Sequence, residues 1–327
     1  ASGLTGQWIF GASTNGNSTV LNANFGQQRF KYPIPSGYAA LNTTALPAAT
    51  IEDGSAQFET VLWTGDSASP RSITGLSFSP DLVYMRPRNY ARNNTFYDTV
   101  RGAGKKLYSD GNDAEDSGTG RGYLSSFDSD GFTLTDGSAG DQDTNNSSYN
   151  YVAWCWDAGA NSNKTYTVKV VSDSGNKYRF DDFGTSAVTL DLAGQAGAKT
   201  TIVVAASAPT LFYYCNVHSG MGGQANTNAT AGASNFDGSI QAKLKANPTA
   251  GFSIVSWTSS SSVSTVGHGL NAAPYFIITK NRSTTNAWWS YHFSVGNTKA
   301  IRLDTTDAPS TMSSAWNNTS PTNSVFT

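Results

Sequence analysis

The amino-acid sequence predicts an all-β protein built from two homologous β-sandwich modules. Short runs of β-branched and aromatic residues recur along the chain, and Gly, Asn, Ser or Thr interrupt them about every ten residues, a spacing typical of sandwiches and barrels. No long stretch shows the 3.6-residue periodicity of an amphipathic helix. A third observation, an internal repeat, gives the number of modules.

The repeat relates Phe58–Thr133 to Phe252–Thr327. At a constant offset of 194 residues (252 − 58), the two stretches align without a gap and share 18 identical residues, among them Trp63 with Trp257. We therefore infer that one module was duplicated, and that other segments were placed before and between its copies.

The repeat divides the chain into four segments. We expect an N-terminal segment at 1–55, copy 1 of the module at 56–159, an insert at 160–232 and copy 2 at 233–327. Strand patterns in copy 1 are Phe58–Trp63, Leu82–Arg86, Phe96–Val100, Lys105–Tyr108, Phe132–Leu134 and Tyr151–Trp156. Strand patterns in the insert are Thr165–Val171, Ala187–Leu192 and Thr200–Val204.

One predicted strand has no counterpart. Copy 1 continues past Phe132 to the apolar strand Tyr151–Trp156, whereas copy 2 stops at Thr327. A sandwich without that strand would expose apolar surface and an open sheet edge. We therefore expect that the polypeptide continues beyond Thr327, or that a neighbouring subunit supplies the strand.

The composition argues against several classes of partner. Charged residues make up only 13% of the chain, with Lys+Arg 21 against Asp+Glu 23, so no basic surface is expected to hold nucleic acid. No apolar run approaches the roughly 20 residues of a membrane-spanning helix. With three histidines and no Ser-His-Asp set or carboxylate pair that stands out, we expect neither an enzyme nor a bound cofactor.

Two sets of motifs resemble phage proteins. The sequence Asn24-Phe25-Gly26-Gln27, followed by Pro35-x-Gly37-Tyr38, resembles the C-terminal end of SPRY-type β-sandwiches in phage proteins. Motifs of the repeat, such as Tyr97–Lys105 and Val266–Leu270, resemble a β-module of tail-fibre and other virion proteins of marine phages. The resemblance implies a non-enzymatic virion protein in a tail fibre, spike or capsid fibre, which we expect to form a homotrimer and to contact other virion proteins.

The insert contains a possible metal-binding loop. The spacing of Cys215, His218 and Met221 resembles the ligand loop of cupredoxins, in which a thiolate, an imidazole and a thioether hold copper. Such a site needs a second histidine upstream of the cysteine, and no histidine precedes Cys215. We therefore expect a degenerate cupredoxin-like insert without copper, and a buried free thiol at Cys155; a copper protein is the less favoured alternative.

Aromatic side chains provide the remaining candidate site. Trp288 and Trp289 lie in a connection of copy 2 that corresponds to the connection holding Tyr90 in copy 1. On a neutral, amide-rich surface, such rings suit stacking against a sugar of the host surface. The competing interpretation is that the tryptophans pack inward. A carbohydrate-binding adhesin outside a virion is the alternative function.

Overall fold

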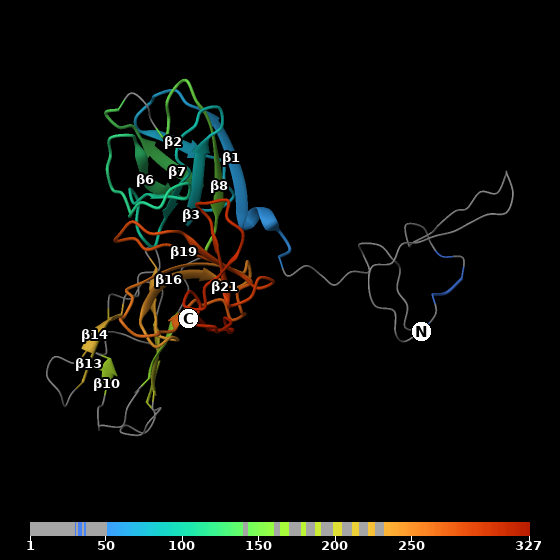
Figure 1. Ribbon diagram of the computed structural model, residues 1–327, viewed down its shortest axis with the longest axis vertical. Coiled ribbons are helices and arrows are strands. Elements are labelled where there is room, and N and C mark those ends of the chain that lie inside the picture. Colours follow the sequence, from blue (N-terminus) through green and yellow to red (C-terminus); the bar gives the residue numbers. More distant parts are fainter. Residues whose placement is uncertain are drawn as a thin grey trace. The chain divides into compact units, whose positions relative to one another are not determined.

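The structure, a computed structural model, divides the chain into two compact units, and it describes part of each unit. It describes residues 51–139, 143–159 and 232–327, the backbone of six strands between 164 and 225, and residues 30, 32–34 and 36. The units are Ala1–Glu52 and Asp53–Thr327. All described strands belong to the second unit (Figure 1). The predicted SPRY-like strands fall outside the described residues.

The prediction of an all-β fold is confirmed. Apart from the short 3₁₀ helix η2 (Gly54–Ala56), every described element is a strand. The strands of copy 1 are β1 (Phe58–Thr64), β2 (Arg71–Thr74), β3 (Leu82–Pro87), β4 (Thr95–Asp98), β5 (Leu107–Tyr108), β6 (Tyr123–Asp128), β7 (Gly131–Thr135) and β8 (Asn150–Trp156). They form two antiparallel sheets, in the orders β1-β8-β3-β4-β5 and β2-β7-β6.

The core of copy 1 lies against β8. This strand is hydrogen-bonded to β1 on one side and β3 on the other, and Figure 1 shows it between them. Because side chains alternate along a strand, Tyr151, Ala153 and Cys155 all point into the core and are completely buried. Cys155 is a free thiol, as predicted, and burial raises its pKa to about 12.

Copy 2 is divided among three sheets. Its strands are β15 (Ala233–Asn235), β16 (Ala242–Asn247), β17 (Phe252–Trp257), β18 (Val266–Gly267), β19 (Phe276–Thr279), β20 (Trp289–His292), β21 (Lys299–Arg302), β22 (Ser310–Thr311) and β23 (Val325–Phe326). The orders are β15-β16-β17, β18-β23 and β19-β20-β21-β22.

The strand registers of copy 2 repeat those of copy 1. Leu82 lies opposite Asp98 in the β3–β4 pair, and Phe276 lies opposite His292 in the β19–β20 pair, each 194 residues further on. The β20–β21 pair repeats the register of β4–β5 at the same offset. The β21–β22 pair likewise repeats the bridge between Lys106 and Asp116. Only β18–β23 differs, by one residue of register, from its counterpart β2–β7. The two stretches of the repeat therefore form the same strand ladder.

A pair of aromatic rings is also repeated in the two cores. Trp63 meets Phe132 edge to face, with centroids 6.0 Å apart and planes at 71°. Trp257 meets Phe326 in the same way, at 5.4 Å and 74°. In copy 1 the Trp63 ring also stacks on Tyr151 of β8. In copy 2, β16 pairs with the edge of β17 that corresponds to the edge of β1 paired with β8, and in the described residues β19 pairs only with β20.

The insert forms two small antiparallel sheets. Its strands are β9 (Lys164–Lys169), β10 (Tyr178–Phe180), β11 (Ala187–Leu190), β12 (Lys199–Val204), β13 (Leu211–Cys215) and β14 (Gly222–Ala225). The orders are β11-β12-β9 and β10-β13-β14, and β9, β11 and β12 coincide with the three predicted strands. His218 and Met221 fall outside the described residues. None of the described helical segments has the length and apolar character needed to cross a bilayer.

Candidate functional site

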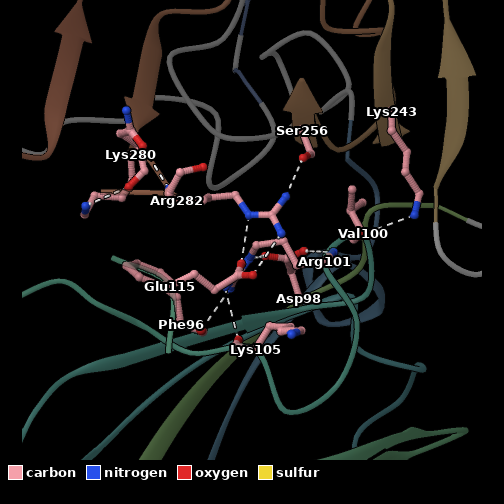
Figure 2. A network of polar contacts seen from close by, with 12 residues as sticks. Phe96, Asp98, Val100, Arg101, Lys105, Glu115, Lys243, Ser256, Lys280 and Arg282 are labelled. Carbon is pink, nitrogen blue, oxygen red and sulfur yellow. Dashed lines mark hydrogen bonds and ion pairs between the residues drawn. The ribbon is translucent and has the colours of Figure 1, made fainter. Parts of the chain in front are cut away.

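The most elaborate polar structure in the described residues is the joint between copy 1 and copy 2. Its centre is Glu115 of copy 1, which receives two hydrogen bonds from Arg282 of copy 2, from Nε to Oε2 at 2.8 Å and from Nη2 to Oε1 at 2.9 Å. Arg282 also donates from Nη1 to Ser256 Oγ at 2.9 Å. This fork-to-fork arrangement fixes direction as well as distance. Figure 2 shows the guanidinium between the two modules.

A second arginine holds Glu115 from within copy 1. The buried Arg101 side chain donates from Nη1 to Glu115 Oε2 at 3.3 Å and from Nη2 to Phe96 O at 2.9 Å, and its Nε binds Asp98 (Figure 2). Burial by itself would raise the pKa of Glu115, but hydrogen bonds and charge from Arg282 and Arg101 outweigh burial and hold this pKa below its ordinary value. The carboxylate is thus kept ionised between two guanidinium groups.

Backbone hydrogen bonds join the same two segments. Glu115 N donates to Arg282 O at 2.9 Å, and Asn286 N donates to Asn112 O at 2.8 Å. These bonds pair the loop after β19 with the loop after β5. The salt bridge is therefore built on backbone that is already fixed across the joint.

A buried carboxylate makes a further contact across the joint. Asp81 of copy 1 forms an ion pair with Lys245 of copy 2 at 2.5 Å, and it also accepts from Thr99 Oγ1 at 3.0 Å and Ala158 N at 2.9 Å. Burial raises the pKa of Asp81, although Lys245 acts in the opposite direction. Nearby, Lys243 Nζ donates to the carbonyl of Val100 at 3.2 Å (Figure 2).

Trp288 belongs to the joint. Its side chain is only 4% exposed, and its indole Nε1 donates to Tyr108 O at 2.8 Å and to Gly111 O at 3.0 Å, both in copy 1. The ring also contacts Phe96, with centroids 5.6 Å apart. The structure therefore places this predicted sugar-stacking residue in the joint, with its side chain buried.

The other two predicted stacking residues lie apart from Trp288. Trp289 is half-buried, and the Arg302 guanidinium covers its ring at 5.0 Å from the centroid. Tyr90 is 48% exposed and stacks on Tyr149 at 4.5 Å. In the described part of the chain no ring contact joins Tyr90 to either tryptophan.

Copy 1 also contains a small polar pocket of about 450 Å³. Its lining residues are Asn93, Lys106, Tyr108, Asp116, Gly118, Gly120 and Arg121. The buried Lys106 Nζ lies 3.2 Å from Asp116 Oδ2 and donates to Gly122 O at 3.4 Å, while Tyr108 OH donates to Asp116 Oδ2 at 3.1 Å. Burial raises the pKa of Tyr108, and the charge of Asp116 raises it further, so the phenol remains protonated.

The polar pocket is specific to copy 1. At the offset of 194 residues, Ala300 replaces Lys106 and Ser310 replaces Asp116, although the strand register is the same at this point. The duplicated fold therefore does not need these charges. A pocket lined by ammonium, guanidinium, carboxylate, amide and phenol groups can bind a ligand rich in hydroxyl groups through several hydrogen bonds.

The described residues offer no metal centre. No group of three or more His, Cys, Asp or Glu side chains within the described ranges could hold a metal ion. Cys215 ends β13, and the loop that follows it lies outside the described residues.

Sequence reasoning missed both the joint and the pocket. Glu115 gives no signal in the repeat, because Pro309 stands at the equivalent position of copy 2. The replacement of Lys106 by Ala300 was visible in the repeat. A charged residue found in only one copy is the signal in the sequence that marks this pocket.

Comparison with known proteins places the chain in a family. The family model described as Domain of unknown function (DUF7483) matches twice, at residues 53–228 and 225–327. No match was found among curated proteins or among solved structures. The two family matches cover most of the chain, and the second contains nearly all of copy 2. The chain therefore belongs to the family described as Domain of unknown function (DUF7483).

Proposed function

We propose that this chain is a non-enzymatic structural protein of a phage virion, part of a tail fibre, spike or capsid fibre, which holds two β-modules in one fixed orientation. The single observation that supports an architectural role best is the joint, in which Arg282 of copy 2 is held by Glu115 of copy 1 in a bidentate salt bridge. The placement in a virion rests on the resemblance of the repeat to phage β-modules.

The physical case for this role is the stiffness of the joint. Modules on a free linker move independently, whereas paired backbone, two ion pairs and a buried indole oppose rotation of one module against the other. An appendage that presents repeated surfaces at fixed spacing converts weak contacts into avidity. We expect neighbouring virion proteins and further copies of this chain as partners.

We further propose that host glycans are bound in the polar pocket of copy 1 rather than on the tryptophans. Trp288 is buried in the joint, whereas the pocket presents Asn93 and Arg121 as exposed side chains on its rim. The same pocket would serve an adhesin outside a virion, so the two settings must be separated by experiment.

Mass spectrometry of purified phage particles tests the placement. Peptides from 56–159 and 233–327 recovered from intact, washed particles would support a virion protein. A protein present only in the particle-free fraction, and able to bind glycans there, would be an adhesin and not a virion component.

A glycan array tests the pocket. We expect the double variant Asn93→Ala/Arg121→Ala to lose at least about tenfold in glycan affinity, because each side chain supplies hydrogen bonds worth about 1 kcal/mol. Tyr90→Ala is the control and should bind like the wild type. Loss of binding in Tyr90→Ala alone would point to the aromatic surface instead.

A further inference from the structure

We propose that the polar pocket of copy 1 selects uncharged sugars over acidic sugars, and that Asp116 is the residue that makes this selection. The inference rests on the proposed function, because it names the class of glycan that the same pocket binds. The acidic sugars meant here are uronates, which carry a carboxylate at the carbon where the uncharged sugar carries a hydroxymethyl group. The pocket, at about 450 Å³, has the size of a ligand pocket.

The carboxylate of Asp116 is held in one position by three donors. Its Oδ1 accepts from Gly118 N at 2.6 Å, and its Oδ2 accepts from Tyr108 OH at 3.1 Å and lies 3.2 Å from Lys106 Nζ. A Cβ on Gly118 would lie only 2.9 Å from Oδ1, so the backbone of this loop lies directly against the carboxylate. A group that is fixed before the ligand arrives loses little freedom on binding. Asp116 is therefore a preorganised acceptor.

The acceptor capacity that remains on Asp116 suits a hydroxyl group. A carboxylate offers about four acceptor positions, so three donors leave about one position for a ligand. The side chain lines the pocket and is 41% exposed, so a ligand can reach it. A sugar hydroxyl can donate to Asp116 while it accepts from a neighbouring donor. A ligand carboxylate only accepts, and it would bring two like charges together, which costs affinity.

The ammonium group of Lys106 does not reverse this preference. Its side chain is only 2% exposed, and it pairs with Asp116 and donates to Gly122 O at 3.4 Å. The charge of Lys106 is thus balanced inside the protein by the same carboxylate that faces the ligand. An acidic sugar would have to compete with Asp116 for this ammonium group, whereas an uncharged sugar leaves the pair intact.

A second carboxylate balances the guanidinium group on the rim. Arg121 is exposed, and the buried Asp143 donates its backbone N–H to Arg121 O at 2.8 Å. Burial, the charge of Asp116 and the charge of Asp143 all raise the pKa of Tyr108, whereas the charge of Arg121 lowers it, so these charges act at the pocket. The two cations, Lys106 and Arg121, and the two carboxylates sum to zero (2 − 2). The described residues therefore provide no net positive charge for an anion.

The repeat shows that these side chains are not required by the fold. All five polar side chains that line the pocket of copy 1 have different counterparts in copy 2. At the offset of 194 residues, Asn93, Lys106, Tyr108, Asp116 and Arg121 correspond to Ala287, Ala300, Arg302, Ser310 and Ala315. The backbone pairing of Lys106 with Asp116 is nevertheless repeated by Ala300 and Ser310. The polar lining is therefore available for a ligand, and we expect one such site in each chain.

Matched pairs of glycans test the selection directly. The full chain is applied to an array of oligosaccharides that end in glucose, galactose or mannose, each printed beside the oligosaccharide that ends in the corresponding uronate. In every pair that binds, we expect the uncharged member to bind at least about tenfold more tightly. Binding of the uncharged member should change less than about twofold between about 50 and 500 mM NaCl, because it pairs no charge with the protein.

Removal of the Asp116 charge tests the residue. Asp116→Asn keeps the shape of the side chain, and we expect the affinity for the uronate relative to that for the uncharged sugar to rise at least about tenfold. Asp130→Asn is the matched control, because Asp130 is an exposed carboxylate of copy 1 that does not line the pocket. Its relative affinity should equal that of the wild type.

A second variant separates selection from folding. Asp116→Asn leaves the buried Lys106 without its anion, whereas Lys106→Ala/Asp116→Ser introduces the residues that copy 2 carries in the same register. We expect this double variant to keep the circular dichroism spectrum of the wild type. It should bind the uncharged sugar at least about tenfold more weakly, since it lacks the hydrogen bonds of both side chains, and it should lose the preference for the uncharged sugar.

The possible failures are distinguishable. If uronates bind as tightly as uncharged sugars, and Asn93→Ala/Arg121→Ala abolishes this binding, the selection is wrong although the pocket remains a glycan site. A preference that persists in both Asp116→Asn and Lys106→Ala/Asp116→Ser would also overturn the inference, since another residue would then make the selection. Binding by no member of any pair, or binding that Asn93→Ala/Arg121→Ala leaves unchanged, would refute the pocket as a glycan site and this inference with it.

Discussion

The Glu115 carboxylate connects the two modules through its ion pair with Arg282. Replacing it with glutamine keeps the shape of the side chain but removes the anionic partner of the Arg282 guanidinium, whereas Arg101 keeps its ion pair with Asp98. Because Arg282 is partly exposed, we expect a loss of about 1–2 kcal/mol in the free energy of unfolding at pH 7. Urea denaturation measures this loss. Asp307→Asn, which removes the exposed, 3.9 Å pair with Arg302, should change stability by less than about 0.5 kcal/mol.

The pH dependence of the same variant gives an independent check. The pKa of Glu115 is lower in the folded protein than its ordinary value of 4.5, so the stabilisation is present above pH 4.5 and is lost as pH falls through the folded pKa. The difference between the wild type and Glu115→Gln should therefore shrink on acidification. A difference that is constant from pH 7 to pH 3 would show that charge is not responsible.

A buried histidine should give copy 2 its own pH dependence. His268 accepts from Leu270 N at Nδ1, at 3.2 Å, and its Nε2 donates to Thr322 O at 3.2 Å. Burial lowers the pKa of His268 below 6.5. The unfolded chain then takes up a proton more readily than the folded one, so stability falls as pH drops below 6.5, by at most about 1.4 kcal/mol per pH unit.

Urea midpoints between pH 7.5 and 5.5 measure this dependence. His268→Gln should have lower stability with a flatter pH profile. If the slope persists in His268→Gln, another group is responsible.

At the scale of elements, glycine positions explain why the register of β18–β23 differs from that of β2–β7. In copy 1 a Cβ on Gly131 would lie 1.9 Å from the carbonyl oxygen of Ile73. The equivalent residues of copy 2 are Val325 and Gly267, so the glycine has moved to the opposite strand. The register changes by one residue at the same pair, which accommodates the valine.

This close approach predicts that alanine substitution will destabilise the protein at Gly131 but not at Gly54. Gly131→Ala should reduce the free energy of unfolding by about 1–3 kcal/mol, because the backbone of β2 must shift to admit the methyl group. Gly54→Ala, where a Cβ would meet no atom within 4 Å, should have little effect. Thermal unfolding of both variants makes the comparison, and equal stability would contradict the strand packing described for β2 and β7.

Sequence patterns predicted the elements better than the contacts between them. The repeat predicted a shared strand ladder because identical residues such as Trp63 and Trp257 have the same neighbours in both cores. It could not predict β16, which pairs with β17 in copy 2, because β16 precedes the repeated stretch, which begins at Phe252. Nor could it show that Trp288 is buried, since the carbonyl groups that bind its indole come from a segment about 180 residues earlier.

At the scale of the whole molecule, the joint determines whether copies 1 and 2 behave as one body. Residues Asp53–Thr327 form one compact unit, and the contacts across the joint combine charge, backbone pairing and a buried ring. Each contact contributes only about 1–2 kcal/mol, yet together they exceed the cost of ordering a few side chains. Among the described residues, copy 2 has fewer buried apolar side chains than copy 1, so it should depend on the joint more than copy 1 does.

Removing the joint should therefore loosen copy 2 selectively. In the triple variant Lys245→Ala/Arg282→Ala/Trp288→Ala, we expect amides of β20 to exchange at least about tenfold faster than in the wild type, while amides of β4 change little, because copy 1 keeps its own complete core. Hydrogen exchange with mass spectrometry resolves the two copies. Arg302→Ala is the control. Equal acceleration of β4 and β20 would mean that the copies unfold together for another reason, and no acceleration would mean that the joint contributes nothing to the stability of copy 2.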